Sequence, residues 1–227
     1  MQRLKDTKTR LILKDPMIWI AVMAAILYCS WPLGFLLNPS VAHHAFASQL
    51  EASGQPYNWL FITLDVLSGL ALIIGGILQW RRSRQPVIRL SIIAYVVFAL
   101  LVIVAAVVPY NCDSLATSCD GIAHTPLSII HGSASIMSAV FLFFCLTLLL
   151  KIIFKKYRLH WFTMLGLMVV SFWGVLGVIA LIVNKTHHAD ENIVQDMFMT
   201  LCSLSVILSV VVIEYLLIIS KKPRKNH

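Results

Sequence analysis

Three ionisable side chains, Asp65, His131 and Asp196, stand inside or at the edge of long apolar stretches of this 227-residue sequence. A charged group costs about 3 kcal/mol on membrane-insertion scales, so such residues are rare unless they have a role. On helices that rise about 1.5 Å per residue, all three lie roughly 5–10 Å from the same ends of their stretches. We therefore predict that they meet at one depth.

Serine residues flank His131 at helical spacing, because Ser128 lies three residues before it and Ser135 four residues after it. Residues three or four apart share one face of an α-helix, which predicts a polar stripe that faces protein or water. The residues predicted to line a ligand site are Asp65, Ser68, His124, Ser128, His131, Ser135 and Asp196.

Several kinds of chemistry fit these side chains. Polar groups inside a bundle can hold helices together or bind a ligand. In an enzyme, His131 would act as a general base and Asp65 would orient it. His124, His131 and Asp65 could also hold zinc, which accepts imidazole and carboxylate ligands, although no H-E-x-x-H spacing occurs. Any other cofactor is unknown from the sequence.

Cys112 and Cys119 bracket the polar stretch that precedes His131. If this stretch lies outside the cytoplasm, oxidation is permitted and a disulfide between the two cysteines is the leading interpretation. Two free thiols in a loop are the alternative.

The composition is that of a membrane protein, with 59% apolar and only 12% charged residues. A helix needs about 20 apolar residues to cross a hydrocarbon core of about 30 Å. Six runs are long enough, at residues 17–37, 59–80, 87–108, 127–150, 161–183 and 193–220. Because backbone groups in lipid must be satisfied internally, we predict an all-α fold, a six-helix transmembrane bundle at 17–220.

The basic residues predict the orientation of this bundle. Sixteen of the 18 Lys and Arg residues lie before the first run, after the sixth, or in the second and fourth connections. Arg89 lies at the start of the third run on the same side, which leaves Lys185 on the other side. Short loops with this bias face the cytoplasm, so residues 1–16 and 221–227 are predicted to be cytoplasmic. The same distribution favours contact with anionic headgroups and argues against nucleic acid as the partner of this net charge of +8.

Local signals predict where helices begin and break. Pro16 and Pro126 suit the first turn of a helix, and Thr125 would cap the second of these helices. Pro32 should interrupt the first helix near its outer end. Apolar spacing over residues 42–52 predicts a short interfacial helix.

The chain resembles the bacterial family called domain of unknown function 998, six-helix proteins distantly similar to the Frag/DRAM/Sfk membrane families. The residues that carry the resemblance are Ala47-Ser48-Gln49-Leu50, Gly54, Asp65, Gly69, Pro109, Asp113, His124, His131 and Gln195-Asp196. The resemblance implies a six-helix fold with an outward-facing polar cluster in a bacterial inner membrane. Related families are associated with lipid or glycolipid handling. The Cys112–Cys119 pair is no part of this pattern.

Three functions follow as hypotheses. The first is a membrane protein that binds a polar or lipid-headgroup ligand in an outward-facing pocket between the helices at 59–80, 127–150 and 193–220. The second is an intramembrane hydrolase or transferase that acts on a lipid and uses His131 and Asp65. The third is a non-catalytic assembly or accessory subunit, which would form homo- or hetero-oligomers through the small-residue faces of the second and fifth helices. Membrane lipid is the expected partner in each case.

Overall fold

The computed structural model describes residues 15–44, 47–108, 126–157, 166 and 191–220, and over these residues every regular element is a helix. The helices are α2 (Pro16–Tyr28), η1 (Trp31–Leu33), α3 (Gly34–Leu37), α4 (Pro39–His44), η2 (Ala47–Glu51), α5 (Asn58–Arg82), α6 (Pro86–Val107), α7 (Pro126–Tyr157) and α9 (Glu191–Ser220). The all-α prediction is confirmed.

Five segments in the described part of the chain are long and apolar enough to cross a membrane. They are Pro16–Leu37, Asn58–Arg82, Pro86–Val107, Pro126–Ile153 and Met199–Ile218. They correspond to five of the six predicted runs. The sixth, at residues 161–183, lies outside the described residues except for Gly166, which packs against Leu150 of α7.

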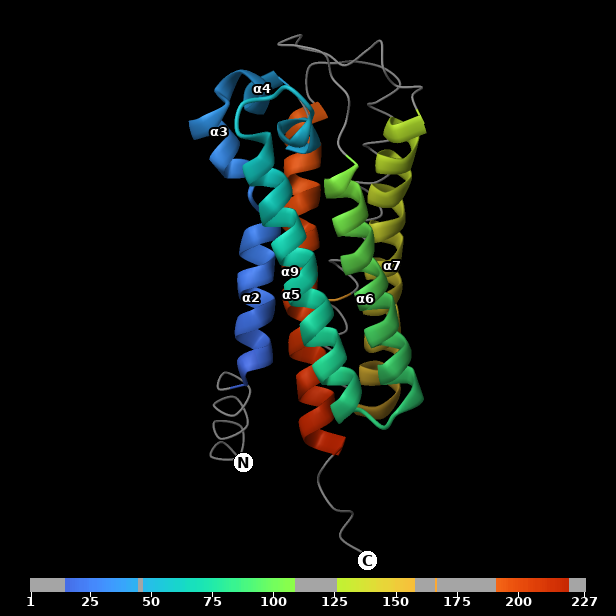
Figure 1. The fold of residues 1–227 in the computed structure, drawn as a ribbon. Helices are drawn as coiled ribbons and strands as arrows, with labels where there is room; N and C mark the ends of the chain where they lie inside the picture. Colours follow the sequence, from blue (N-terminus) through green and yellow to red (C-terminus); the bar gives the residue numbers. More distant parts are fainter. Residues whose placement is uncertain (1–14, 45–46, 109–125, 158–165, 167–190, 221–227) are drawn as a thin grey trace, which may run out of the picture.

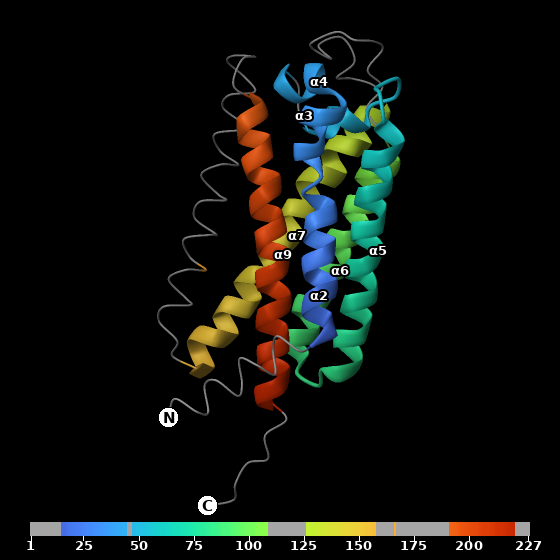
Figure 2. The same ribbon diagram turned by 90° about the vertical axis from the view of Figure 1, so that its left-hand side faces the viewer.

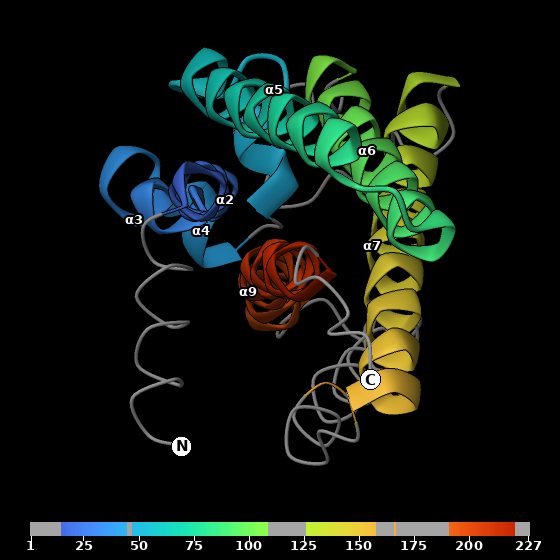
Figure 3. The same ribbon diagram turned by 90° about the horizontal axis from the view of Figure 1, so that it is seen from below.

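The long helices stand side by side, with their ends at two common levels (Figure 1). Seen along the bundle, α5, α6 and α7 form a row, and α9 packs against both α2 and α7 (Figure 3). The core lies between them and centres on Tyr95 and Phe98 of α6, which are 1% and 0% exposed. Tyr28 of α2 meets Phe98 edge-on, with 5.9 Å between ring centroids. α6 lies between α5 and α7 and packs against both of them.

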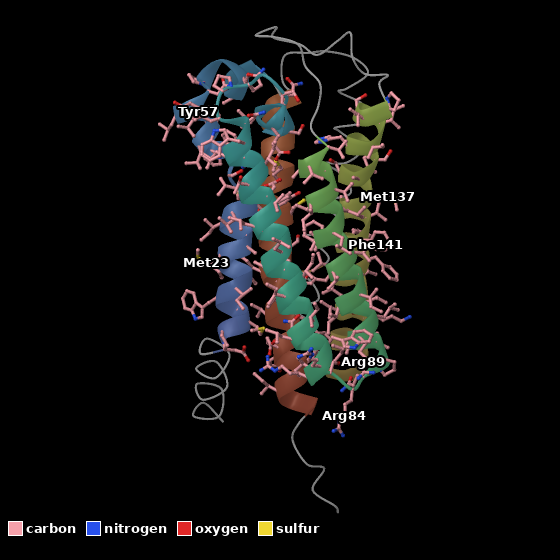
Figure 4. The ribbon with its side chains drawn as sticks, viewed as in Figure 1. Met23, Tyr57, Arg84, Arg89, Met137 and Phe141 are labelled. Carbon is pink, nitrogen blue, oxygen red and sulfur yellow. The ribbon has the colours of Figure 1, made fainter. Side chains whose placement is uncertain are left out.

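Apolar side chains also cover the outside of the bundle, as expected for surfaces in contact with lipid. Examples are Met23 on α2 and Met137 on α7, which are 55% and 43% exposed (Figure 4). Water would penalise such a surface, and a hydrocarbon solvent would not. The exposed apolar residues therefore support a location in a membrane.

The helices begin and break close to the predicted residues. At the start of α2, Pro16 takes the first position and the Asp15 Oδ1 atom accepts from the Met17 N–H at 3.0 Å. α2 ends at Tyr28, and Pro32 lies in the separate 3₁₀ helix η1, so the predicted interruption is confirmed. α7 begins at Pro126 as predicted, while Thr125 is outside the described residues.

The four short helices η1, α3, α4 and η2, which we call the cap, fold over one end of the bundle (Figure 2). The single helix predicted over residues 42–52 is wrong, because this segment contains the end of α4 and then the separate η2. The amide of Asn38 donates to the Gln55 Oε1 atom at 3.0 Å and ties the start of α4 to the segment that leads into α5.

The other end of the bundle, where α2 begins, α9 ends and the α5–α6 turn lies, is rich in arginine, and we call it the basic end. Arg84 and Arg89 lie here, and Tyr57 lies at the cap end (Figure 4). Arg82 donates to both oxygens of the fully buried Glu214, at 3.0 and 3.1 Å, and to Asp15 at 2.8 Å. Arg82 therefore neutralises Glu214 and joins α2, α5 and α9.

The small-residue face of α5 is used inside the chain. A Cβ atom on Gly69 would lie 2.5 Å from the Ile103 side chain and 2.9 Å from the Ala99 carbonyl oxygen, both on α6. A Cβ on Gly76 would lie 2.5 Å from Val96 of the same helix. These glycines therefore let α5 and α6 approach closely, which is the packing role of small residues in membrane helices.

Candidate functional site

Two buried carboxyl groups meet beneath the cap. Glu51 at the end of η2 is 7% exposed, and Asp65 in the second turn of α5 is 6% exposed. The two side chains lie close enough to interact with each other. A hydrogen bond between two carboxyl groups would require at least one proton, because ionised carboxyl groups only accept. We call Glu51 and Asp65 the carboxyl pair.

Glu51 is buried because its neighbours in sequence are anchored. Leu50 is 2% exposed and packs with Val41 of α4 and Phe61 of α5 in a small apolar cluster separate from the main core. Ala52, on the other side of Glu51, is fully buried. With both neighbours inside and η2 in contact with α4, α5 and α9, the glutamate side chain cannot reach the surface.

One oxygen of the pair is buried without an N–H or O–H donor. The Asp65 Oδ1 atom accepts no hydrogen bond from the described residues. An unsatisfied buried acceptor costs about 1–3 kcal/mol, so such an atom in a folded protein asks for an explanation. A ligand that donates to Asp65 Oδ1 would supply one.

Two more helices reach the carboxyl pair. Tyr28, at the end of α2, lies close enough to interact with both carboxyl groups and with Cys202 of α9. One turn along α5 from Asp65, the Ser68 hydroxyl donates to the Ala24 carbonyl of α2 at 2.8 Å. The site is thus built by η2, α2, α5 and α9, and the predicted site residue Ser68 holds two of these helices together.

Burial changes the acidity of the pair. It raises the pKa of Glu51 from 4.5 to about 7, and the interaction with Asp65 opposes part of this rise. Glu51 therefore titrates near neutral pH. Once Glu51 has lost its proton, it carries a negative charge beside Asp65.

Tryptophan residues indicate the depth of the pair in a membrane. Trp59 and Trp80 mark the two ends of α5, and 21 residues of helix span about 31 Å, close to the thickness of a hydrocarbon core. Trp59 is 63% exposed, as expected of a side chain at the membrane–water interface. Asp65 follows it by six residues, so the pair lies roughly 9 Å below the interface on the cap side.

His131 is engaged elsewhere. Its Nδ1 atom lies 2.8 Å from the Ala105 carbonyl oxygen and 3.0 Å from that of Val108. These carbonyls belong to the end of α6, where the last turn has no intrahelical donors. Nδ1–H of His131 therefore caps α6 from α7. Because His131 contacts these carbonyls and Asp65 interacts with Glu51, the structure gives no support to Asp65 orienting His131 as a base, and that hypothesis stays a prediction.

The predicted serine stripe of α7 is a packing surface. Ser128 is 4% exposed and lies on the same face as His131. Ser135 donates to the His131 carbonyl at 3.0 Å, and Ser138 donates to the Ser135 carbonyl at 2.7 Å. Hydroxyl groups that bond their own helix in this way can be buried without a ligand.

Several predicted site residues cannot be placed. His124, Cys112 and Cys119 lie outside the described residues, and Asp196 is on α9 with its side chain undescribed. Within the described ranges, no group of three His, Cys, Asp or Glu side chains could hold a metal ion. His131 and Asp65, the two described candidates for zinc, have the separate partners given above.

Sequence reasoning missed Glu51. It follows Leu50 in a polar segment that reads as a solvated loop, so its charge gives no sign of burial. The available signal was the spacing of Phe46 and Leu50, which predicts an apolar face on this segment and, with it, contact with the bundle.

The apolar length of the helices and the lipid-compatible surface define the class, a helical membrane protein with several spans. The family model described as "Protein of unknown function (DUF998)" matches residues 20–217, and the chain belongs to this family. No curated protein and no solved structure matches the chain.

Proposed function

We propose that this protein binds a polar or lipid-headgroup ligand at the cap end and that the carboxyl pair holds it. The observation that carries the proposal is the buried Oδ1 atom of Asp65, which accepts no hydrogen bond from the described residues. Its depth of roughly 9 Å below the interface puts it in the outer part of the acyl-chain region, within reach of a headgroup that is drawn slightly inward. Because binding at this site needs no metal and no nucleophile, we favour binding over the hydrolase or transferase alternative.

We further propose the topology of the chain. Residues 161–183 form a sixth span, both termini are cytoplasmic, and the cap faces away from the cytoplasm of a bacterial cell. The distribution of Lys and Arg along the sequence supports this orientation, since 17 of 18 lie before the first predicted span, after the sixth, or at the second and fourth connections. Reporter fusions at the two termini and within residues 52–57 test it, and a cytoplasmic signal from the cap would overturn it.

We also propose that Cys112 and Cys119 form a disulfide on the cap side, where oxidation is permitted. Thiol labelling of intact membranes before and after reduction tests this pairing. Cys29, Cys145 and Cys202 are free and mostly buried, so they make a small and constant contribution to the labelling. Equal labelling before and after reduction would count against the bond.

The ligand proposal is tested by identifying what co-purifies with the protein. Wild type, Asp65→Asn and Glu51→Gln are purified in a mild detergent, and bound small molecules are identified by mass spectrometry. Thr63→Val is the matched control, because Thr63 lies at a similar depth on the exposed face of α5 and bonds its own helix. We expect wild type and Thr63→Val to retain the same ligand and both carboxyl variants to lose it.

Two outcomes would overturn the proposal. If all four proteins retain the same molecules, the pair does not hold a ligand. If none retains any, and both carboxyl variants only lower the melting temperature, the pair is a structural contact between the cap and α5. The accessory-subunit alternative would then stand, and co-purification of a second protein would support it.

A further inference from the structure

The carboxyl pair offers hydrogen-bond acceptors and negative charge in one place. Glu51 contributes a carboxylate when it is ionised, and Asp65 contributes its buried Oδ1 atom, which accepts no hydrogen bond from the described residues. Neither residue forms an ion pair with a cation of the described part of the chain, where both salt bridges involve Arg82 at the basic end. The pair is thus complementary to a ligand group that is cationic and donates hydrogen bonds.

Resting on the function proposed above, we propose that the group held between Glu51 and Asp65 is a primary ammonium group. An ammonium ion has three N–H donors and no acceptor, so it can donate to the Glu51 carboxylate and to Asp65 Oδ1 together. Charge-assisted hydrogen bonds of this kind are about twice as strong as neutral ones. An anionic part of a headgroup would instead lie against two carboxyl groups, which offer it hydrogen-bond acceptors and almost no donors.

A metal ion fits the site less well. Divalent cations take four to eight ligands from the protein and water. The described residues supply two carboxyl groups here and no third His, Cys, Asp or Glu side chain. An ammonium group is satisfied by the acceptors that are present.

Entry of such a group requires displacement of η2, whose apolar contacts are separate from the main core. Val41, Leu50 and Phe61 form an apolar cluster separate from the main core, and Leu50 is the residue that anchors η2. Small clusters of few contacts open at a lower free energy than the core does. Displacement of η2 would expose Glu51 and Asp65 and leave the packing of Tyr95 and Phe98 in place.

An ammonium group at this depth has two sources, an aminophospholipid headgroup or a free amine. In either case binding tightens as Glu51 loses its proton, because its pKa is about 7. Among the described titratable side chains, Tyr28 of α2 is influenced by both carboxyl groups, and Cys202 of α9 is in turn influenced by Tyr28; α4 carries His43 and His44 in its sequence. Variants of Glu51 isolate its share of the pH dependence.

The test uses the full chain in nanodiscs of neutral lipid. Binding of phosphatidylethanolamine, phosphatidylcholine, phosphatidylglycerol and free ethanolamine is measured by native mass spectrometry or calorimetry at about pH 6 and pH 8. The proteins are wild type, Asp65→Asn, Glu51→Gln and the control Thr63→Val. Phosphatidylcholine is the key comparison, because its quaternary ammonium has the charge and lacks N–H donors.

We expect phosphatidylethanolamine to bind wild type and Thr63→Val at least about tenfold more tightly than the other two lipids. Binding should weaken at the lower pH, and both carboxyl variants should lose it. Binding of free ethanolamine in place of the lipid supports the same ligand chemistry with a soluble source. If wild type binds all three lipids equally and Asp65→Asn binds none of them, the proposed headgroup function stands and the ammonium inference is wrong. If Asp65→Asn and Glu51→Gln bind every lipid as wild type does, both fail.

Discussion

Replacement of Glu51 with Gln should remove a pH dependence from the stability of the folded protein. Burial raises the pKa of Glu51 from 4.5 to about 7, so the folded protein keeps this proton over a range in which the unfolded chain releases it. The contribution to stability is therefore full below about pH 4.5 and is lost as the pH rises to about 7. Each pKa unit corresponds to about 1.36 kcal/mol, so the total loss is on the order of 3 kcal/mol.

The assay is thermal unfolding in detergent at about pH 5 and pH 8, at constant ionic strength. The wild-type melting temperature should fall between these values by roughly 6 °C more than that of Glu51→Gln, at about 2 °C per kcal/mol for a chain of this size. Histidines titrate in both proteins and cancel in the comparison. Asp15 does not interfere with this comparison. Burial acts to raise the pKa of Asp15, but hydrogen bonds from Arg82 and Met17 lower it overall. The contribution of Asp15 to stability is therefore lost only at more acidic pH. Parallel profiles for the two proteins would refute the reasoning.

Further substitutions test the contacts that hold the bundle together. Arg82→Met leaves the carboxylate of Glu214 buried without its cation and should lower the free energy of unfolding by about 1.5–3 kcal/mol. In a double-mutant cycle, Glu214→Gln should remove most of this loss, and additive losses from the two substitutions would contradict the pairing. His131→Ala should cost about 1–2 kcal/mol through loss of the α6 cap, and normal amide-exchange protection at the end of α6 would argue against this. Gly69→Ala should cost about 1–3 kcal/mol in melting experiments through its clash with α6, whereas Gly132→Ala meets open space and should not destabilise; equal effects would contradict the packing.

The helices could be predicted from the sequence because their signals are local. Apolar run length decides whether a helix can span lipid, and the prolines at 16 and 126 fix two helix starts through their restricted φ and missing N–H. The cap could be predicted only in outline. Its two short helices in place of one depend on how Leu50 packs against α4 and α5, which is tertiary information.

Only part of the site could be predicted, because the rest depends on tertiary contacts. Asp65 stands out because a carboxyl group is conspicuous in an apolar run, and the structure buries it as expected. Its partner Glu51 is conspicuous only after the chain folds back. His131 was recognised as an inward-facing residue, but its partners are main-chain carbonyls at the end of α6, and a residue pattern carries no sign of these.

The central claim is that the carboxyl pair holds a ligand under the cap, and an experimental density map of the lipid-embedded protein tests it most directly. The account predicts density from a bound group within hydrogen-bonding distance of both Glu51 and the Asp65 Oδ1 atom, and its absence from Asp65→Asn. A map in which Asp65 Oδ1 accepts from a protein donor, with no bound group beside the pair, would contradict the account.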